Sequence, residues 1–345
     1  MKEKSKHIVI LTPGFPINEA DTTCIPALQI YVKALREISG YDITVVSVHK
    51  PFENKVYAWN EIPVYALGSS SFFYKILLWK KVSLTLKQIH LEKPIEVLHS
   101  FWLNECAFIG YWFSKKKNIY HLTTLMGQDA LKSNSYTRIL PLKKMRLITL
   151  SDFHERIFFK NYNIKTTQIP WGINSKSFPY LTHKKIDIIG IGYLNELKNY
   201  ELFIDVVYQI NQEKPINVVL IGEGILKDKL LEKIKNHKLE NTIELKGELS
   251  NEETLQYLSQ SKILLHTSNY ESFGLVFAEA LESKTRIVSL NIGCAFMNPN
   301  WANCKDKTEM ITACKNWLSK PFDTTERNPF TIEKTVNHYL KIYNE

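Results

Sequence analysis

Cysteine is scarce in this chain. The cysteines are odd in number and show no Cys-x-x-Cys or Cys/His spacing, which argues against a disulfide framework and against a zinc site. They are Cys24, Cys106, Cys294, Cys304 and Cys314. Free thiols are typical of a reducing compartment, so we expect a cytoplasmic protein.

Long apolar runs are also lacking. The strongest candidate, residues 72–81, is much shorter than the roughly 20 apolar residues that cross a bilayer, and it carries lysines. The basic N-terminus is followed by only a short strand-like run before Pro13-Gly14. We therefore expect neither a spanning helix nor a signal peptide.

Acidic residues are few in the first half of the chain. Residues 1–170 hold 23 Lys and Arg against 13 Asp and Glu, whereas residues 171–345 hold 21 against 22. Such an excess suggests an anionic partner, although lysines that are merely solvated produce it too. No nucleic-acid-binding module is recognisable, so we expect no nucleic acid among the partners and retain peripheral contact with an anionic membrane at its inner face.

The chain has 345 residues, 44% hydrophobic and 23% charged, which suits two globular domains that each bury a core. Short apolar runs alternate with helical patterns, as in parallel strands joined by helical crossovers. The strands expected are 7–11, 43–48, 97–99, 120–125, 147–150, 186–191, 218–221, 242–245, 263–266 and 286–290. The helices expected are 27–38, 73–90, 107–113, 153–161, 200–212, 226–237, 252–259, 276–283 and 332–343.

These patterns predict an α/β protein with two Rossmann-like, doubly wound parallel sheets. Pro170 and Gly172 break both periodicities, which places the domain boundary there. We expect domains at 1–170 and 171–325 and a C-terminal segment at 326–345. In open α/β sheets, ligands bind beyond the carboxyl ends of the strands.

A second informative feature is a strand-to-helix loop that carries two glutamates. Residues 263–267 form an apolar run, and Glu271-Ser272-Phe273-Gly274-Leu275 follows, with Glu279 eight positions after Glu271. The first N–H groups of a helix and its dipole attract anions, and a glycine lets a bulky group approach the backbone. Glu279 can accept hydrogen bonds from sugar hydroxyls. The segment therefore predicts a site for a sugar nucleotide.

This motif resembles the paired-glutamate motif of retaining, nucleotide-sugar-dependent glycosyltransferases of the GT-B fold, the group 1 or family 4 type. Other segments follow the order of that family over nearly the whole chain. They are Thr12-Pro13-Gly14-Phe15-Pro16, residues 97–102, Met126-Gly127-Gln128-Asp129, Leu150-Ser151, residues 169–174, residues 191–194 with Lys198-Asn199, residues 221–224 and Leu245-Lys246-Gly247.

The resemblance implies a GT-B fold in which two Rossmann-like domains face a cleft. The donor domain would be the C-terminal one, the acceptor domain the N-terminal one, and the last helix would cross back to the first domain. The implied activity is a retaining, metal-independent hexosyltransferase without cofactor, working in surface polysaccharide or glycoconjugate synthesis. Its donor would be a nucleoside-diphosphate sugar of the UDP or GDP type, and its acceptor a glycan or lipid-linked glycan.

Carried over residue by residue, the resemblance assigns catalytic roles to Lys198, Glu271 and Asp129. Lys198 would neutralise the leaving diphosphate, Glu271 would face the donor sugar, and Asp129 would anchor a hydroxyl or stabilise charge. The donor-binding set is Glu279, Phe273, Gly274, Leu275, Gly14, Gly222, Lys246, Asn195 and His99. No metal ligand is expected.

Several alternatives stay open. Gly14 also fits a plain tight turn, and His99 also fits a core histidine. Residues 72–90 fit both a membrane-surface helix and an ordinary crossover helix whose lysines snorkel. Tyr193, Met126 and Lys284 stand where the family tends to carry arginine, histidine and glycine, and these departures motivate a second hypothesis, a catalytically silent GT-B subunit that binds nucleotide or glycan.

Overall fold

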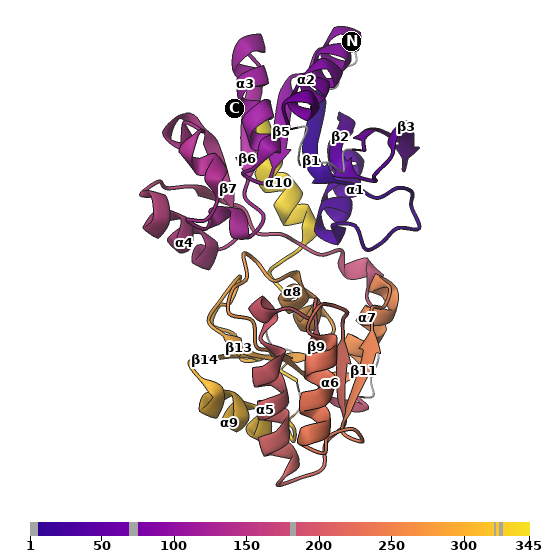
Figure 1. Cartoon of the computed structure of the whole chain (residues 1–345), viewed down its shortest axis with the longest axis vertical. Helices are drawn as coiled ribbons and strands as arrows, with labels where there is room; N and C mark the ends of the chain where they lie inside the picture. The colour runs from indigo at the N-terminus through magenta and orange to yellow at the C-terminus, as the bar shows by residue number, and fades with distance from the viewer. Residues whose placement is uncertain (1–5, 69–74, 180–183, 321, 324–326) are drawn as a thin grey trace. The chain divides into compact units, whose positions relative to one another are not determined.

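The computed structural model describes residues 6–68, 75–179, 184–320, 322–323 and 327–345. The chain forms two compact units (Figure 1). Unit 1 comprises Met1–Gly172 together with Ile332–Glu345, and unit 2 comprises Ile173–Thr331. The sequence placed the first boundary at 170 and the second at 325.

Unit 1 contains an eight-stranded sheet in the order β3-β4-β2-β1-β5-β6-β7-β8. All neighbours pair in parallel except β3 and β4, which are antiparallel. The strands are β1 (His7–Gly14), β2 (Asp42–Lys50), β3 (Asn54–Trp59), β4 (Ile62–Leu67), β5 (Val97–Phe101), β6 (Tyr120–Thr124), β7 (Arg146–Thr149) and β8 (Thr167–Gln168).

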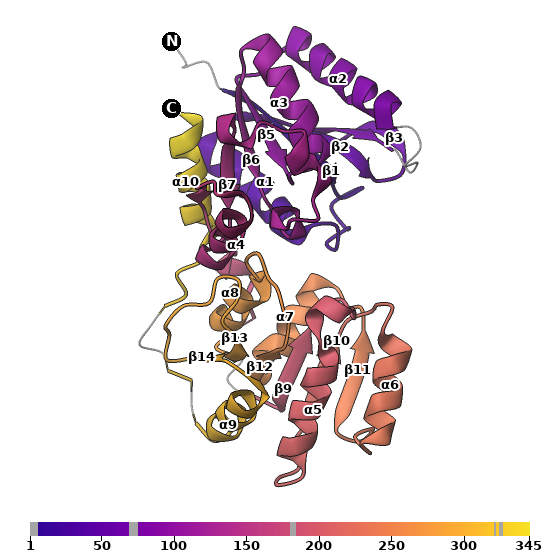
Figure 2. The ribbon, with the colours of Figure 1, turned by 60° about the vertical axis from the view of Figure 1, so that its left-hand side comes forward.

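Helices cover both faces of this sheet (Figure 2). They are α1 (Pro26–Ser39), α2 (Lys75–Glu92), α3 (Glu105–Lys117), α4 (Asp152–Tyr162) and α10 (Ile332–Tyr343). Successive strand residues point to opposite faces. Leu98 accordingly packs in the core under α2 and α3, whereas its neighbour His99 packs against Tyr31 of α1 and Tyr339 of α10.

Unit 2 contains a six-stranded parallel sheet in the order β11-β10-β9-β12-β13-β14. Its strands are β9 (Ile186–Ile191), β10 (Val218–Ile221), β11 (Ile243–Gly247), β12 (Ser261–His266), β13 (Arg286–Leu290) and β14 (Trp301–Cys304). Its helices are α5 (Tyr200–Asn211), α6 (Lys227–Asn236), α7 (Asn251–Ser259), α8 (Leu275–Glu282) and α9 (Lys307–Trp317).

One core cluster of unit 2 lies between the sheet and α5, α6 and α9. The helices α7 and α8 pack on β9 and β13 (Figure 2). The order of the strands reverses at β9, whose two neighbours are β10 and β12. Ligands of doubly wound sheets bind at such a reversal, beyond the carboxyl ends of the strands.

The structure corrects the expected elements in a few places. The β3–β4 hairpin, β8, β14 and α9 were not predicted, and the antiparallel pairing of β3 makes the first sheet mixed. The helix expected at 73–90 is found as α2, with Phe73 and Tyr74 lying outside the described residues. Within the described ranges, no helix has the length and apolarity needed to cross a bilayer.

Candidate active site

The predicted glutamate segment joins β12 to α8, as the sequence indicated. Gly274 precedes the helix with φ 79°, in the left-handed region. A Cβ at this position would lie 2.6 Å from the ring of Phe277, so only glycine fits without rearrangement. No side chain caps the helix. The N–H of Phe277 donates to the carbonyl of Gly274 at 2.9 Å, and those of Leu275 and Val276 are available to a ligand.

Glu271 lies at the centre of a charged network. Its Oε1 atom accepts hydrogen bonds from Lys198 Nζ and, at 3.0 Å, from His266 Nε2. Burial raises the pKa of the Glu271 carboxyl, but the charge of Lys198 and the hydrogen bonds from His266 and Lys198 outweigh burial and bring the pKa to about 2. The carboxylate is thus ionised at neutral pH.

The position of Lys198 is set by two loops. Lys198 ends a 3-10 turn, Glu196–Lys198, whose cap is Asn195: its side chain accepts a hydrogen bond from Lys198 N at 3.1 Å. From the loop after β12, Thr267 Oγ1 donates to the carbonyl of Lys198 at 3.0 Å, and Ser268 Oγ donates to that of Leu197 at 3.1 Å. The turn after β9 and the loop after β12 are therefore joined at the reversal of the sheet.

Glu279 lies in α8 and differs from Glu271 in having no partner. Its side chain is buried, and no hydrogen bond or ion pair reaches it from any described residue. Burial raises the pKa of its carboxyl to about 7. A buried carboxyl group without a partner is costly, and groups with strongly shifted pKa values cluster at functional sites. A ligand hydroxyl group would supply the missing hydrogen bond.

Glycine allows the turns after β9 and β10 to pack closely. Gly222 has φ 153°, and a Cβ there would lie 2.0 Å from the carbonyl oxygen of Gly192. The N–H of Gly222 donates to the carbonyl of Gly247 at 2.8 Å. Lys246 is held by Glu244 at 2.5 Å and lies over the ring of Tyr257, 5.2 Å from its centroid.

The two remaining donor residues of the motif belong to the same segment. Phe273 is buried against Phe330, with ring centroids 5.2 Å apart, and its carbonyl accepts a hydrogen bond from Cys294 N at 2.8 Å. Leu275 is the first residue of α8. These contacts fix the loop that carries Glu271.

Asp129 in unit 1 binds backbone. Its carboxylate accepts hydrogen bonds from the N–H groups of Leu103 at 2.8 Å, Gly127 at 2.6 Å and Met126 at 3.1 Å. Desolvation raises the pKa of this buried carboxyl, against the effect of those hydrogen bonds. Asp129 therefore holds the loop after β6 against β5, and its role toward substrate stays a prediction.

His99 lies in the core of unit 1, which favours the core alternative for this residue. Its Nδ1 is 2.6 Å from Tyr343 Oη and its Nε2 is 2.8 Å from Thr124 Oγ1. Burial lowers the pKa of the imidazole well below its usual value. Gly14 ends β1, and a Cβ there would lie 3.4 Å from both Ile25 and Lys50.

The structure thus brings together Lys198, Glu271 and the α8 segment in unit 2, and it places Asp129, His99 and Gly14 in unit 1. Sequence reasoning missed His266, which contacts Glu271 directly. The available signal was a polar residue at the end of an otherwise apolar strand, immediately before the glutamate motif. No group of three or more metal-ligating side chains occurs within the described part of the chain.

Comparison with known proteins bears on the family of unit 2 and on the fold of the chain. Residues 174–297, within unit 2, match the family model described as glycosyl transferases group 1. Most of unit 2 thus matches the model of the group 1 glycosyl transferases. An uncharacterised glycosyltransferase of Methanocaldococcus jannaschii is 25% identical over 216 residues, which cover 60% of this chain and 59% of that protein. The chain thus matches somewhat more than half the length of that relative.

A second relative is the N-acetylgalactosamine-N,N'-diacetylbacillosaminyl-diphospho-undecaprenol 4-alpha-N-acetylgalactosaminyltransferase of Campylobacter jejuni. It is 22% identical over 290 residues, covering 77% of this chain and 74% of that protein.

Solved structures extend the likeness beyond the group 1 domain. Sucrose-phosphate synthase from Thermosynechococcus elongatus has a TM-score of 0.78 and 16% identity, with 98% of each chain covered. Anabaena HepE, in complex with UDP and glucose, has a TM-score of 0.76 and 14% identity, with 98% of this chain and 99% of that chain covered. The fold of the chain is therefore GT-B, with two α/β units whose sheets are parallel except for β3.

Proposed function

We propose that this protein is a hexosyltransferase that moves a sugar from a nucleoside-diphosphate sugar to a glycan or lipid-linked acceptor, with retention and without a divalent metal. The observation that carries the proposal is the ion pair between Lys198 and Glu271, which lies where the strand order of the unit 2 sheet reverses. Glu271 is followed directly by α8, a helix that no side chain caps and that contains the unpartnered Glu279. This set supplies a cation, free N–H groups and hydroxyl acceptors in one domain.

Each group has a role in the proposed transfer. As the bond from the anomeric carbon to the phosphate oxygen breaks, Lys198 and the N–H groups of α8 stabilise the departing diphosphate. Ionised Glu271 faces the positive charge that develops on the sugar, and Glu279 accepts hydrogen bonds from the ribose hydroxyls. The acceptor oxygen forms the new bond on the same face, and its proton passes to the departing phosphate oxygen.

The proposed donor class and the proposed acceptor class are each supported by a different similar protein. A neighbour of the same fold, Anabaena HepE, has been solved with UDP-glucose, which favours a donor of the UDP type while leaving GDP open. The name of the Campylobacter jejuni relative specifies a diphospho-undecaprenol-linked acceptor. We extend both to this chain as a proposal, and with them a place in surface polysaccharide or glycoconjugate synthesis at the inner face of the membrane.

The silent-subunit hypothesis is less well supported. Lys284, one of its motivating residues, follows α8 with φ 54° in the left-handed region. That conformation explains why glycine is usual there, because a side chain costs roughly 1–2 kcal/mol in it. Lys284 therefore strains the local backbone. It does not disturb the Lys198–Glu271 ion pair, which is present.

Calorimetric titration of the purified protein with UDP, GDP, ADP, CMP and their sugar conjugates tests the proposal. We expect one diphosphate family to bind, and binding to be lost in Lys198→Ala and Glu279→Ala. Lys262→Ala is the matched control, because Lys262 also forms an ion pair, 2.7 Å from Asp187. Lys262 lies at the start of β12, so this pair is at the amino end of the strands, opposite to the candidate site. Absence of binding to every nucleotide would favour the silent subunit instead.

Two further assays address the finer claims. The anomeric configuration of the product, read by proton NMR, distinguishes retention from inversion. Turnover in the presence of EDTA distinguishes a metal-independent reaction from a metal-dependent one.

A further inference from the structure

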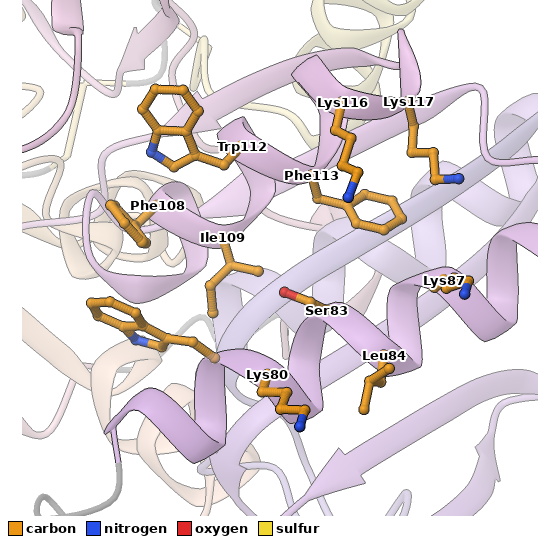
Figure 3. A pocket seen from close by; sticks show the side chains of 11 residues that line it. Lys80, Ser83, Leu84, Lys87, Phe108, Ile109, Trp112, Phe113, Lys116 and Lys117 are labelled. Atoms are coloured by element: carbon orange, nitrogen blue, oxygen red, sulfur yellow. The ribbon is translucent and has the colours of Figure 1, made fainter.

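An apolar groove runs between α2 and α3 of unit 1, and none of its lining residues is among those assigned to sugar transfer. Its volume is about 520 Å³. Figure 3 shows Phe108, Ile109 and Phe113 of α3 between the two helices, with Leu84 on α2 and Trp112 at the end nearest Phe108. The rings of Trp79 from α2 and Phe108 from α3 pack against each other, with centroids 4.6 Å apart.

Lysines line both helices along this groove. Lys80 and Lys87 come from α2, and Lys116 and Lys117 come from α3 (Figure 3). None of the eleven lining residues is acidic. The ammonium groups of these four lysines have no hydrogen bond or ion pair with another described residue. Their charge is therefore available to an anionic partner.

The same surface exposes large apolar side chains at a regular spacing. Leu77, Leu84 and Leu91 follow one another every seven residues along α2, and they are 60%, 55% and 73% exposed. Residues seven apart lie on one side of a helix. Trp112 of α3 is 44% exposed and has the ammonium group of Lys115 5.4 Å from its ring.

Leucine, tryptophan and lysine together on a helical surface match the chemistry of a lipid interface. Apolar side chains enter the boundary between headgroups and acyl chains, tryptophan settles at the headgroup level, and lysines bind anionic phosphates. A protein partner would satisfy the leucines, but four unneutralised lysines would then require matching carboxylates. A bilayer with anionic lipids satisfies both features at once.

We propose that the α2–α3 surface docks on an anionic phospholipid bilayer, with Leu77, Leu84, Leu91 and Trp112 entering the headgroup boundary and Lys80, Lys87, Lys116 and Lys117 contacting lipid phosphates. This deepens the proposed function, because a lipid-linked acceptor resides in a membrane. The docking itself involves no donor and no sugar transfer.

Flotation of the full-length protein with vesicles tests the proposal. Vesicles of equal parts phosphatidylglycerol and phosphatidylcholine are compared with pure phosphatidylcholine vesicles, at low and at high salt. We expect flotation with the anionic vesicles, weak flotation with the neutral ones, and a loss at high salt because surface charges are screened. Equal flotation with both vesicles, or none with either, would overturn the proposal.

Charge variants locate the surface. Lys80→Glu with Lys87→Glu should weaken vesicle binding by about 25-fold or more, since each lysine near an anionic surface contributes about fivefold. Lys143→Glu with Lys144→Glu changes the net charge equally, at two exposed lysines elsewhere in unit 1, and should keep most of the binding. Equal loss in both pairs would mean a diffuse charge effect, which contradicts a defined docking surface.

Apolar variants distinguish a bilayer from another occupant. Trp112→Ala should weaken vesicle binding, while Phe159→Ala, at an aromatic residue of α4 with 42% exposure, should not. If the protein fails to float but sediments as a dimer that Trp112→Ala dissociates, the groove holds a second copy of the chain and the proposal is wrong. Calorimetric nucleotide binding, measured on the same samples, checks folding and separates this outcome from failure of the proposed function.

Discussion

The two units hold the charged and polar residues of their motifs in opposite ways. In unit 2, Lys198 and Glu271 contact each other through their charged groups, and Glu279 has no partner in the described chain. In unit 1, the carboxylate of Asp129 is bound by backbone N–H groups, and both ring nitrogens of His99 are bound by hydroxyl groups. Polar motifs that look alike in the sequence therefore form a candidate ligand site in unit 2, whereas in unit 1 they stabilise a loop and the core.

The largest effect that this comparison predicts is on turnover in Lys198→Ala. Removing one group that stabilises developing charge typically costs about 10²–10³ in kcat. We expect a loss of that size in sugar transfer from the preferred donor. Lys262→Ala, at the opposite edge of the sheet, should keep its turnover. A Lys198→Ala protein that keeps full turnover would mean that the pair is only structural and would remove the difference between the two units.

The second prediction concerns the pH dependence of stability at Glu279. Its folded-state pKa of about 7 exceeds the ordinary value of 4.5, so the folded protein retains a proton that the unfolded chain has lost between these values. Stability from this group is therefore present at low pH and is lost as pH rises through about 7. We expect Glu279→Gln to raise the free energy of unfolding by up to about 3 kcal/mol at about pH 8 and by little at about pH 4.

Urea denaturation at the two pH values measures this difference. Glu240→Gln, at an exposed position of the same unit, should change the free energy of unfolding at neither pH. Nucleotide affinity should fall in Glu279→Gln while stability rises, as expected of a residue kept for binding. An equal gain at both pH values would mean that ionisation of Glu279 is not the cause.

Much of the fold follows from the sequence because parallel strands buried on both faces appear as short apolar runs. Runs such as 186–191 and 286–290 correspond to β9 and β13 residue for residue. The β3–β4 hairpin was missed for a physical reason. Its turn residues Asn60 and Glu61 have φ of 46° and 62°, a conformation usually signalled by glycine, and no glycine is present.

The candidate site was less predictable than the fold. Lys198 and Glu271 are 73 positions apart, and the motif order indicated both without showing that they form a pair. In the sequence, His266 is only the last residue of an apolar strand. No sequence pattern shows that its ring contacts Glu271. The carboxylate of Asp129 accepts hydrogen bonds from backbone N–H groups because of the path that the surrounding loop takes, and the local sequence does not determine that path.

A third, smaller prediction examines unit 1 through Asp129→Asn. The amide nitrogen would face backbone N–H donors, and a buried group left without a partner costs about 2 kcal/mol. We expect a loss of this size in urea denaturation, with nucleotide affinity unchanged. Asp152→Asn, at an exposed residue of α4, should change the free energy of unfolding by less. Lost turnover without lost stability would show that Asp129 acts on substrate, as the family resemblance implies.

The smallest effect is expected for Tyr343→Phe, which tests whether His99 belongs to the core. Tyr343 Oη lies 2.6 Å from His99 Nδ1 and 2.5 Å from Tyr31 Oη, so its removal leaves two buried polar groups short of one partner each. These groups can partly relax, and we expect a loss of about 1 kcal/mol in the free energy of unfolding. Tyr41→Phe, which removes an exposed hydroxyl that binds Asn344, should have almost no effect. If Tyr343→Phe instead lowers transfer at unchanged stability, the His99 ring is coupled to the reaction. Unit 1 would then share the chemistry that the geometry assigns to unit 2.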